Sequence, residues 1–212
     1  SVNTPGSVEN NGVFEIAGPP PLNVHSLPFP ADPTRFYRVQ QFPLPPVTLF
    51  DDDLEGNTDD WTTVVNDGAG DTRWTLGTPG GSTGPISGAG DSLNAWCTNL
   101  GDYGPNSDIS LRSPAIDLTG VASAKLTFQA YRDADGFADT ATVRFLKASD
   151  LTALGEAVLM DMTEFDSDWK TFQIEITPEA IGESILIEWT FLSDNSADAF
   201  SGLSIDNILV SD

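Results

Sequence analysis

The sequence predicts an all-β protein, a two-sheet antiparallel sandwich of jelly-roll type that follows a short proline-rich appendage. Three observations support this class. From residue 48 onward, short segments rich in β-branched and aromatic residues are separated by Gly, Pro, Asn and Asp at short intervals. Several segments alternate strictly, so that Leu126, Phe128 and Ala130 would share one face of a strand. Apart from a short candidate at 178–181, no amphipathic helix interrupts the series.

In chain order, the predicted strands are 47–50, 61–65, 72–75, 93–99, 109–112, 124–131, 140–148, 157–161, 169–176, 184–191 and 203–210. The first and last strands of a β-sandwich commonly lie side by side. We therefore expect the segments around Phe50 and Ile205 to be neighbours.

Length and composition favour one large domain, 48–212, with an appendage, 1–47. The 212 residues are 39% hydrophobic and 19% charged, which is enough to bury a core without disulfides. The appendage is rich in proline and holds two short strand candidates, 13–17 and 35–41. We interpret it as the trailing hairpin of a preceding domain followed by a stiff linker.

The charge balance excludes several classes of partner. With 32 acidic residues against nine Lys and Arg, the formal net charge is −23, which repels nucleic acid and anionic bilayers. Such an excess is also typical of secreted proteins from saline habitats. No segment approaches the length of a membrane span, so membrane insertion is not expected. The N-terminus lacks signal-peptide features, and we expect Ser1 to begin an excised or mature fragment.

Catalytic machinery is not expected. His25 is the single histidine and lies in the appendage, which excludes a Ser-His-Asp or Cys-His arrangement in the main domain. Cys97 is the single cysteine and is interpreted as a small buried side chain. Among 32 acids, some pair would be spaced for glycoside hydrolysis by chance alone. The glycine-rich segment 77–84 lacks the following Lys and helix of a phosphate-binding loop.

Acidic residues near both ends of the main domain predict a calcium site. Ca²⁺ takes six to eight oxygen ligands from carboxylates, amides and backbone carbonyls. Asp53 and Glu55 would share one side of an extended first strand, and Asp206 lies in the last. The full set of candidate ligands is Asp53, Glu55, Asp91, Asn94, Asp139 and Asp206.

Each of these residues has a simpler interpretation as well. Asp and Asn at strand ends cap turns, and for Asp91 and Asp139 the two interpretations stay open. The segment 66–71 superficially resembles a calcium loop but lacks the bidentate Glu of an EF-hand, so a solvated hairpin is favoured. The segment 133–136 is interpreted as a turn.

Aromatic residues are the other candidate ligand-binding groups, because sugars stack on exposed Trp and Tyr rings. Trp74 and Tyr103 adjoin flexible polar segments, and we expect them to line any ligand groove. Their replacement by Ala should then reduce binding and leave the melting midpoint nearly unchanged. Trp96, Trp169 and Trp189 lie in apolar alternation and are expected in the core.

The order of motifs carries a resemblance to a known family. The chain shows Asp53-Leu54-Glu55-Gly56, then Trp74-Thr75-Leu76-Gly77, Asn94-Ala95-Trp96-Cys97, Leu111-Arg112-Ser113-Pro114 and Ile205-Asp206-Asn207-Ile208. This series resembles the jelly-roll adhesin and MAM-like modules of secreted bacterial proteins, and is similar to the cleaved-adhesin domains of gingipain-type proteases. It covers roughly residues 48–212. The chain departs from the common pattern at Leu54, where an aromatic is usual, and at 150–152, which lacks a glycine-rich hairpin.

The resemblance implies a module of a larger secreted or cell-surface bacterial protein, often a peptidase or other hydrolase, and such modules often hold structural calcium. We therefore expect a non-catalytic, calcium-stabilised adhesion or carbohydrate-binding module. Its partners would be a glycan or a cell-surface protein, together with neighbouring domains of the same polypeptide. The alternative is a purely structural domain that stabilises or spaces a neighbouring enzyme, and a catalytic polysaccharide-active sandwich is a distant third.

Overall fold

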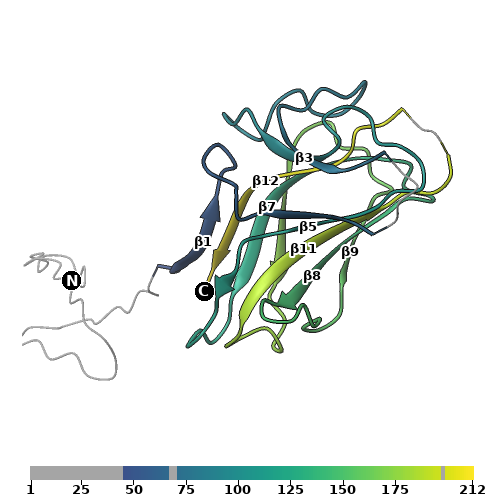
Figure 1. Cartoon of the computed structure of the whole chain (residues 1–212). Coiled ribbons are helices and arrows are strands. Elements are labelled where there is room, and N and C mark those ends of the chain that lie inside the picture. Colours follow the sequence, from purple (N-terminus) through teal and green to yellow (C-terminus); the bar gives the residue numbers. More distant parts are fainter. Residues whose placement is uncertain (1–44, 67–70, 197–198) are drawn as a thin grey trace, which may run out of the picture. The chain divides into compact units, whose positions relative to one another are not determined.

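The computed structural model describes residues 45–66, 71–196 and 199–212 (Figure 1). The chain divides into two units, Ser1–Pro45 and Pro46–Asp212. The predicted strands 13–17 and 35–41 and the histidine at position 25 lie outside the described residues.

Two antiparallel sheets of six strands each form a sandwich, as the sequence predicts. The first sheet has the order β10-β7-β12-β4-β3, and β1 also pairs with β12. Its strands are β1 (Thr48–Asp52), β3 (Trp74–Gly77), β4 (Ala95–Thr98), β7 (Lys125–Asp133), β10 (Lys170–Glu175) and β12 (Gly202–Ser211). The second sheet has the order β2-β5-β11-β8-β9, and β6 also pairs with β11. Its strands are β2 (Thr62–Val65), β5 (Asp108–Arg112), β6 (Ile116–Asp117), β8 (Thr140–Lys147), β9 (Val158–Met160) and β11 (Ser184–Leu192).

The observed strands follow the predicted ones closely, with two differences. The two-residue strand β6 was not predicted, because it is too short to show alternation. The helix candidate at 178–181 is a turn, in which the Ala180 and Ile181 amides bond to the carbonyls of Thr177 and Pro178. Within the described residues, no helix is long and apolar enough to cross a membrane.

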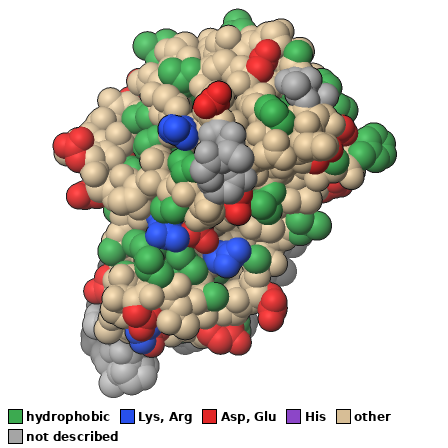
Figure 2. Space-filling model, turned by 45° about the vertical axis from the view of Figure 1, so that its right-hand side comes forward, with side chains coloured by type: hydrophobic (Ala, Val, Ile, Leu, Met, Phe, Trp, Pro, Cys, Tyr) green, Lys and Arg blue, Asp and Glu red, His purple; other side chains and the backbone are tan. Residues whose placement is uncertain are grey.

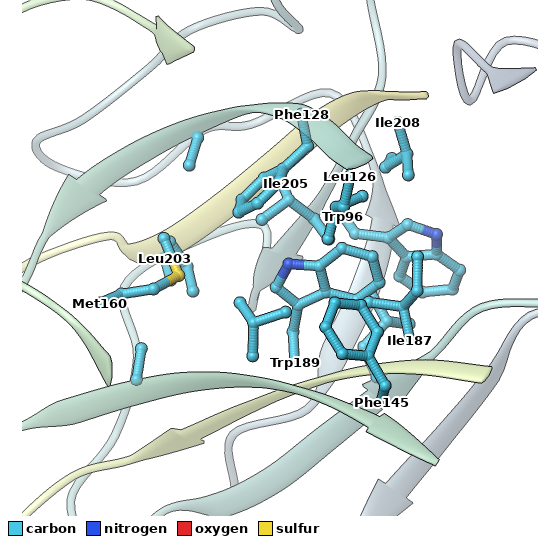
Figure 3. Packing of buried hydrophobic residues seen from close by; sticks show 14 of the residues in the cluster. Trp96, Leu126, Phe128, Phe145, Met160, Ile187, Trp189, Leu203, Ile205 and Ile208 are labelled. Atoms are coloured by element: carbon cyan, nitrogen blue, oxygen red, sulfur yellow. The ribbon is translucent and has the colours of Figure 1, made fainter. Parts of the chain in front are cut away.

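The core lies between the sheets and is built from the inward face of each strand. Leu126 and Phe128 of β7 meet Ile187 and Trp189 of β11, and all four are fully buried (Figure 3). Each such large apolar side chain contributes about 1.5–3 kcal/mol by leaving water. The alternation read from the sequence therefore identifies the face of each strand that holds the sandwich together.

The first and last strands pair antiparallel, as expected, with Asp52 opposite Ile208. Strand β12 is irregular between Asp206 and Leu209, and Asn207 has a φ of 49°. Such a bulge redirects the side chains beside it. It lies where β12 meets both the end of β1 and the long loop 78–94, and so it positions the acidic residues of the candidate site.

Candidate functional site

The turn after β1 presents Glu55. The sequence predicts Asp53 and Glu55 on an extended strand, which is wrong, because β1 ends at Asp52. The Asp52 carboxylate accepts the Leu54 amide at 2.8 Å, and Leu54 has a φ of 60°. The Leu54 side chain is buried in the core, which holds the turn in this uncommon conformation.

The Glu55 carboxylate binds the end of loop 78–94. Its Oε1 accepts the Ser92 hydroxyl at 2.9 Å, the Leu93 amide at 2.9 Å and the Asn94 amide at 2.6 Å. Its Oε2 accepts the Asn94 side-chain amide at 3.1 Å. These donors, the Asn94 backbone amide first, lower the pKa of Glu55.

The Asp206 carboxylate lies beneath the same loop and is fully buried. Its Oδ2 accepts the Ala89 amide at 2.7 Å, and its Oδ1 accepts the Asn207 amide at 2.7 Å. Burial raises the pKa of Asp206, and the charge of nearby Glu55 raises it further. The ion pairs found in the described part of the chain involve neither carboxylate.

Oxygen atoms converge beside Gly88. A Cβ atom at this position would lie 2.4 Å from the Asn94 carbonyl oxygen, 2.4 Å from Ser92 Oγ and 2.6 Å from Asp206 Oδ2. Only a residue without a side chain permits this approach. The loop is thereby held close enough to Asp206 to bring a carboxylate, a hydroxyl and a carbonyl oxygen together.

These residues border a pocket of about 350 Å³, lined by Asp53, Glu55, Ala89, Gly90, Asp91, Ser92 and Asn207. The structure thus brings Asp53, Glu55 and Asp91 to one pocket. Asn94 joins them through its bonds to Glu55, and Asp206 through its bond to Ala89. The sequence interpretation missed Gly88, Ala89 and Ser92, because a glycine and a backbone amide carry no recognisable signature.

The candidate ligand atoms of this site are carboxylate, hydroxyl and carbonyl oxygens, which suit a hard cation such as Ca²⁺. A buried carboxylate without a positive partner is costly, and a bound cation would offset that cost. As the described residues stand, however, they contain no group of three or more His, Cys, Asp or Glu side chains arranged to hold a metal. The Glu55 and Asp206 oxygens instead accept N–H and O–H donors of loop 78–94 and, for Asp206, the adjacent Asn207 amide.

Asp139 belongs to a different part of the molecule. Its carboxylate accepts hydrogen bonds from the Tyr103 hydroxyl and, at 2.9 Å, from the Asp194 amide. Burial raises the pKa of Asp139. The residue lies just before β8, and its partners come from the β4–β5 and β11–β12 loops. Its carboxylate therefore acts as a structural link between loops that are distant in sequence.

Trp74 and Tyr103 do not line an open groove. Their exposed fractions are 4% and 3%. Tyr103 packs edge-on against Phe191, with ring centroids 5.1 Å apart. The polar segments beside both residues predicted exposure, but the rings turn inward to fill the core. Trp96 and Trp189 are buried as expected, and Trp169 is half-buried, with its Nε1 donating to the Ser87 carbonyl at 3.3 Å.

The remaining sequence candidates are structural. Cys97 is buried, and burial raises the pKa of its thiol to about 11. The Asp133 carboxylate is buried and accepts the Ser201 amide at 2.9 Å, so it anchors a loop. Asp135 lies in a turn, as predicted. Most of the segment 66–71 lies outside the described residues.

Comparison with solved structures finds similar folds. The K3 cleaved adhesin domain of Lys-gingipain from Porphyromonas gingivalis superimposes with a TM-score of 0.52 at 18% identity, over 78% of this chain and 100% of that domain. The K1 domain of the same protein superimposes with a TM-score of 0.50 at 20% identity, over 77% and 97%. No protein-family model matches the sequence, and no curated protein shows a significant match. The chain therefore has the fold of these cleaved adhesin domains, as its motifs suggested.

Proposed function

We propose that this chain is a non-catalytic adhesion or carbohydrate-binding module of a larger secreted or surface bacterial protein, and that Ca²⁺ stabilises it. The observation that carries the calcium part is the buried Asp206 carboxylate beside Glu55. The adhesion part is supported by the shared fold with the gingipain adhesin domains. Glycans or cell-surface proteins would be its partners.

A bound Ca²⁺ ion would link three segments of the chain. Glu55 follows β1, Asp206 lies in β12, and Ser92 and Asn94 end loop 78–94. A cation held by their oxygens, with Asp53 and Asp91 at the pocket rim, would join all three segments. It would also neutralise two carboxylates that otherwise repel one another. The site would serve stability, because it would join segments that are far apart in the chain.

The experiment is a thermal melt in EDTA and in millimolar CaCl₂, with MgCl₂ as the control for ionic strength. If Ca²⁺ binds only the folded state, it should raise the melting midpoint. A calcium concentration one hundred times Kd should add about 2.7 kcal/mol to the free energy of unfolding. Asp206→Asn should remove the calcium effect, whereas Asp150→Asn, an exposed carboxylate that accepts the Thr152 amide between β8 and β9 of the second sheet, should retain it. Equal midpoints in EDTA and calcium would refute the proposed calcium site.

The non-catalytic part of the proposal is tested by assaying the purified chain for hydrolysis. The chain should hydrolyse neither peptides nor esters, because the described residues include no histidine to serve as a general base beside a nucleophile. It should bind polysaccharides without cleaving them. Reducing sugar or unsaturated products that a purified sample releases, and that one carboxylate substitution abolishes, would overturn the non-catalytic assignment.

A further inference from the structure

The outer face of the second sheet carries a row of charged side chains across its central strands. Glu188 of β11 lies opposite Arg112 of β5 on one side and opposite Arg144 of β8 on the other. Arg112 Nε donates to Glu188 Oε2 at 2.6 Å, and Arg144 Nε lies 3.4 Å from Glu188 Oε1. One carboxylate thus holds two guanidinium groups side by side.

Most of the donors of these two groups have no partner in the described structure. A guanidinium carries five N–H donors, and Glu188 is the single described acceptor that pairs with either residue. Arg144 Nε is buried without any hydrogen bond. The Arg112 and Arg144 side chains are 21% and 39% exposed. The pair therefore presents fixed, planar donors to anything that lies on this face.

A hollow of about 420 Å³ adjoins the row, lined by Asp60, Thr62, Ser113, Pro114, Ala115 and Leu186. Register places Thr62 directly opposite Arg112. Leu186 lies on the same face of β11 as Glu188, two residues earlier. The hollow thus combines apolar surface with a carboxylate and hydroxyls, next to the arginine donors.

Part of the corresponding face of the first sheet is covered. Loop 78–94 crosses it and is fastened by the Ala89–Asp206 bond and by the Trp169–Ser87 bond. Cys97 and Ser204 point to this side, yet both are buried.

Figure 2 shows how few basic side chains one face of this acidic molecule carries, with carboxylates and hydrophobic groups around them.

We propose that the Arg112–Glu188–Arg144 row and the adjoining hollow bind uncharged sugar units of a glycan. This rests on the proposed function, because it assigns the binding to one face. Sugar hydroxyls both donate and accept, so their oxygens suit the free guanidinium donors and their protons suit Asp60. The C–H face of the ring suits Pro114 and Leu186. Asp60 and the net charge of −23 disfavour a carboxylated sugar.

Affinity electrophoresis and titration calorimetry would test this assignment. The probes are four uncharged polymers (xylan, mixed-linkage β-glucan, mannan and dextran) and two uronate polymers (polygalacturonate and alginate). Arg144→Ala removes donors, and Ala115→Trp fills the hollow from an exposed position without changing charge. Lys170→Ala, an exposed cation on the first sheet, is the matched control. A thermal melt of each variant checks folding.

We expect at least one uncharged polymer to bind, with an affinity that falls about tenfold or more in Arg144→Ala and Ala115→Trp and stays unchanged in Lys170→Ala. Undiminished binding in both folded variants would overturn the assignment of this face and leave the binding function standing. Binding of the uronate polymers alone would overturn the uncharged ligand class. Failure of all six polymers to bind would overturn this glycan site, while the calcium melt would still test the metal separately.

Discussion

Glu55 holds Asn94 at two points, accepting its backbone amide at 2.6 Å and its side-chain amide at 3.1 Å. The two residues are far apart in sequence, so this contact ties the turn after β1 to the end of loop 78–94. The loop in turn covers Asp206. Stability of the first sheet and order of the loop are therefore coupled through one exposed carboxylate.

Removal of this carboxylate should loosen the loop. Glu55→Ala deletes the acceptor of the Leu93 and Asn94 amides, so hydrogen exchange at these amides should accelerate by about tenfold or more. Asp51→Ala is the matched control, because this exposed carboxylate of β1 lies outside the pocket. Equal exchange rates in Glu55→Ala and the parent would show that the loop is held by other contacts.

The buried Asp206 carboxylate should make stability depend on pH. Burial raises its folded pKa above the usual 3.8, so the folded state retains the proton where the unfolded state has lost it. The stability that protonated Asp206 contributes is present below pH 3.8 and is lost as pH rises through the raised folded pKa. In EDTA, the parent should therefore lose stability relative to Asp206→Asn over this range.

Urea unfolding at a series of pH values measures that difference, and the buried Asp139, present in both proteins, cancels. Calcium at neutral pH should restore stability to the parent and not to Asp206→Asn, because the cation favours the ionised carboxylate. A parent and variant with parallel pH curves in EDTA would contradict the raised pKa.

Gly88 should tolerate no side chain. In Gly88→Ala the new methyl group would lie within 2.6 Å of Asp206 Oδ2 and still closer to Ser92 Oγ and the Asn94 carbonyl. We expect a loss of about 1–3 kcal/mol in the free energy of unfolding, together with a weaker calcium effect. Gly56→Ala is the control, since nothing lies within 4 Å of its Cβ position. Unchanged urea unfolding in Gly88→Ala would argue against the close approach of the loop.

Much of this fold could be predicted from sequence, because alternation and turn residues report which face of each strand is buried. Leu126 and Phe128 show this directly, and the pairing of β1 with β12 followed from sandwich topology. The residues at which strands end are harder to predict from the sequence. Asp52 stops β1 by capturing the Leu54 amide, an interaction that depends on where the Leu54 side chain finds room in the core.

The candidate site was predictable in part for the same reason. Carboxylates near the two ends of the main domain indicate Glu55 and Asp206, and the pairing of β1 with β12 brings these two residues close together. Asp139 precedes a strand and is a candidate ligand from sequence, yet its carboxylate bonds to Tyr103 and Asp194 instead. Such loop contacts are set by tertiary packing, which a linear pattern does not encode.

Trp74 is buried in the core, whereas the sequence predicts it in a ligand groove. Because the indole is buried, Trp74→Ala should lower the free energy of unfolding by about 3–5 kcal/mol, contrary to the unchanged midpoint expected from sequence. Its Nε1 has no hydrogen-bond partner among the described residues, so Trp74→Phe should lose packing only and should destabilise the protein clearly less than Trp74→Ala. Urea unfolding of both variants beside the parent measures the two losses. A Trp74→Ala protein as stable as the parent would mean that the ring lies outside the core and would return it to the list of candidate ligand-binding residues.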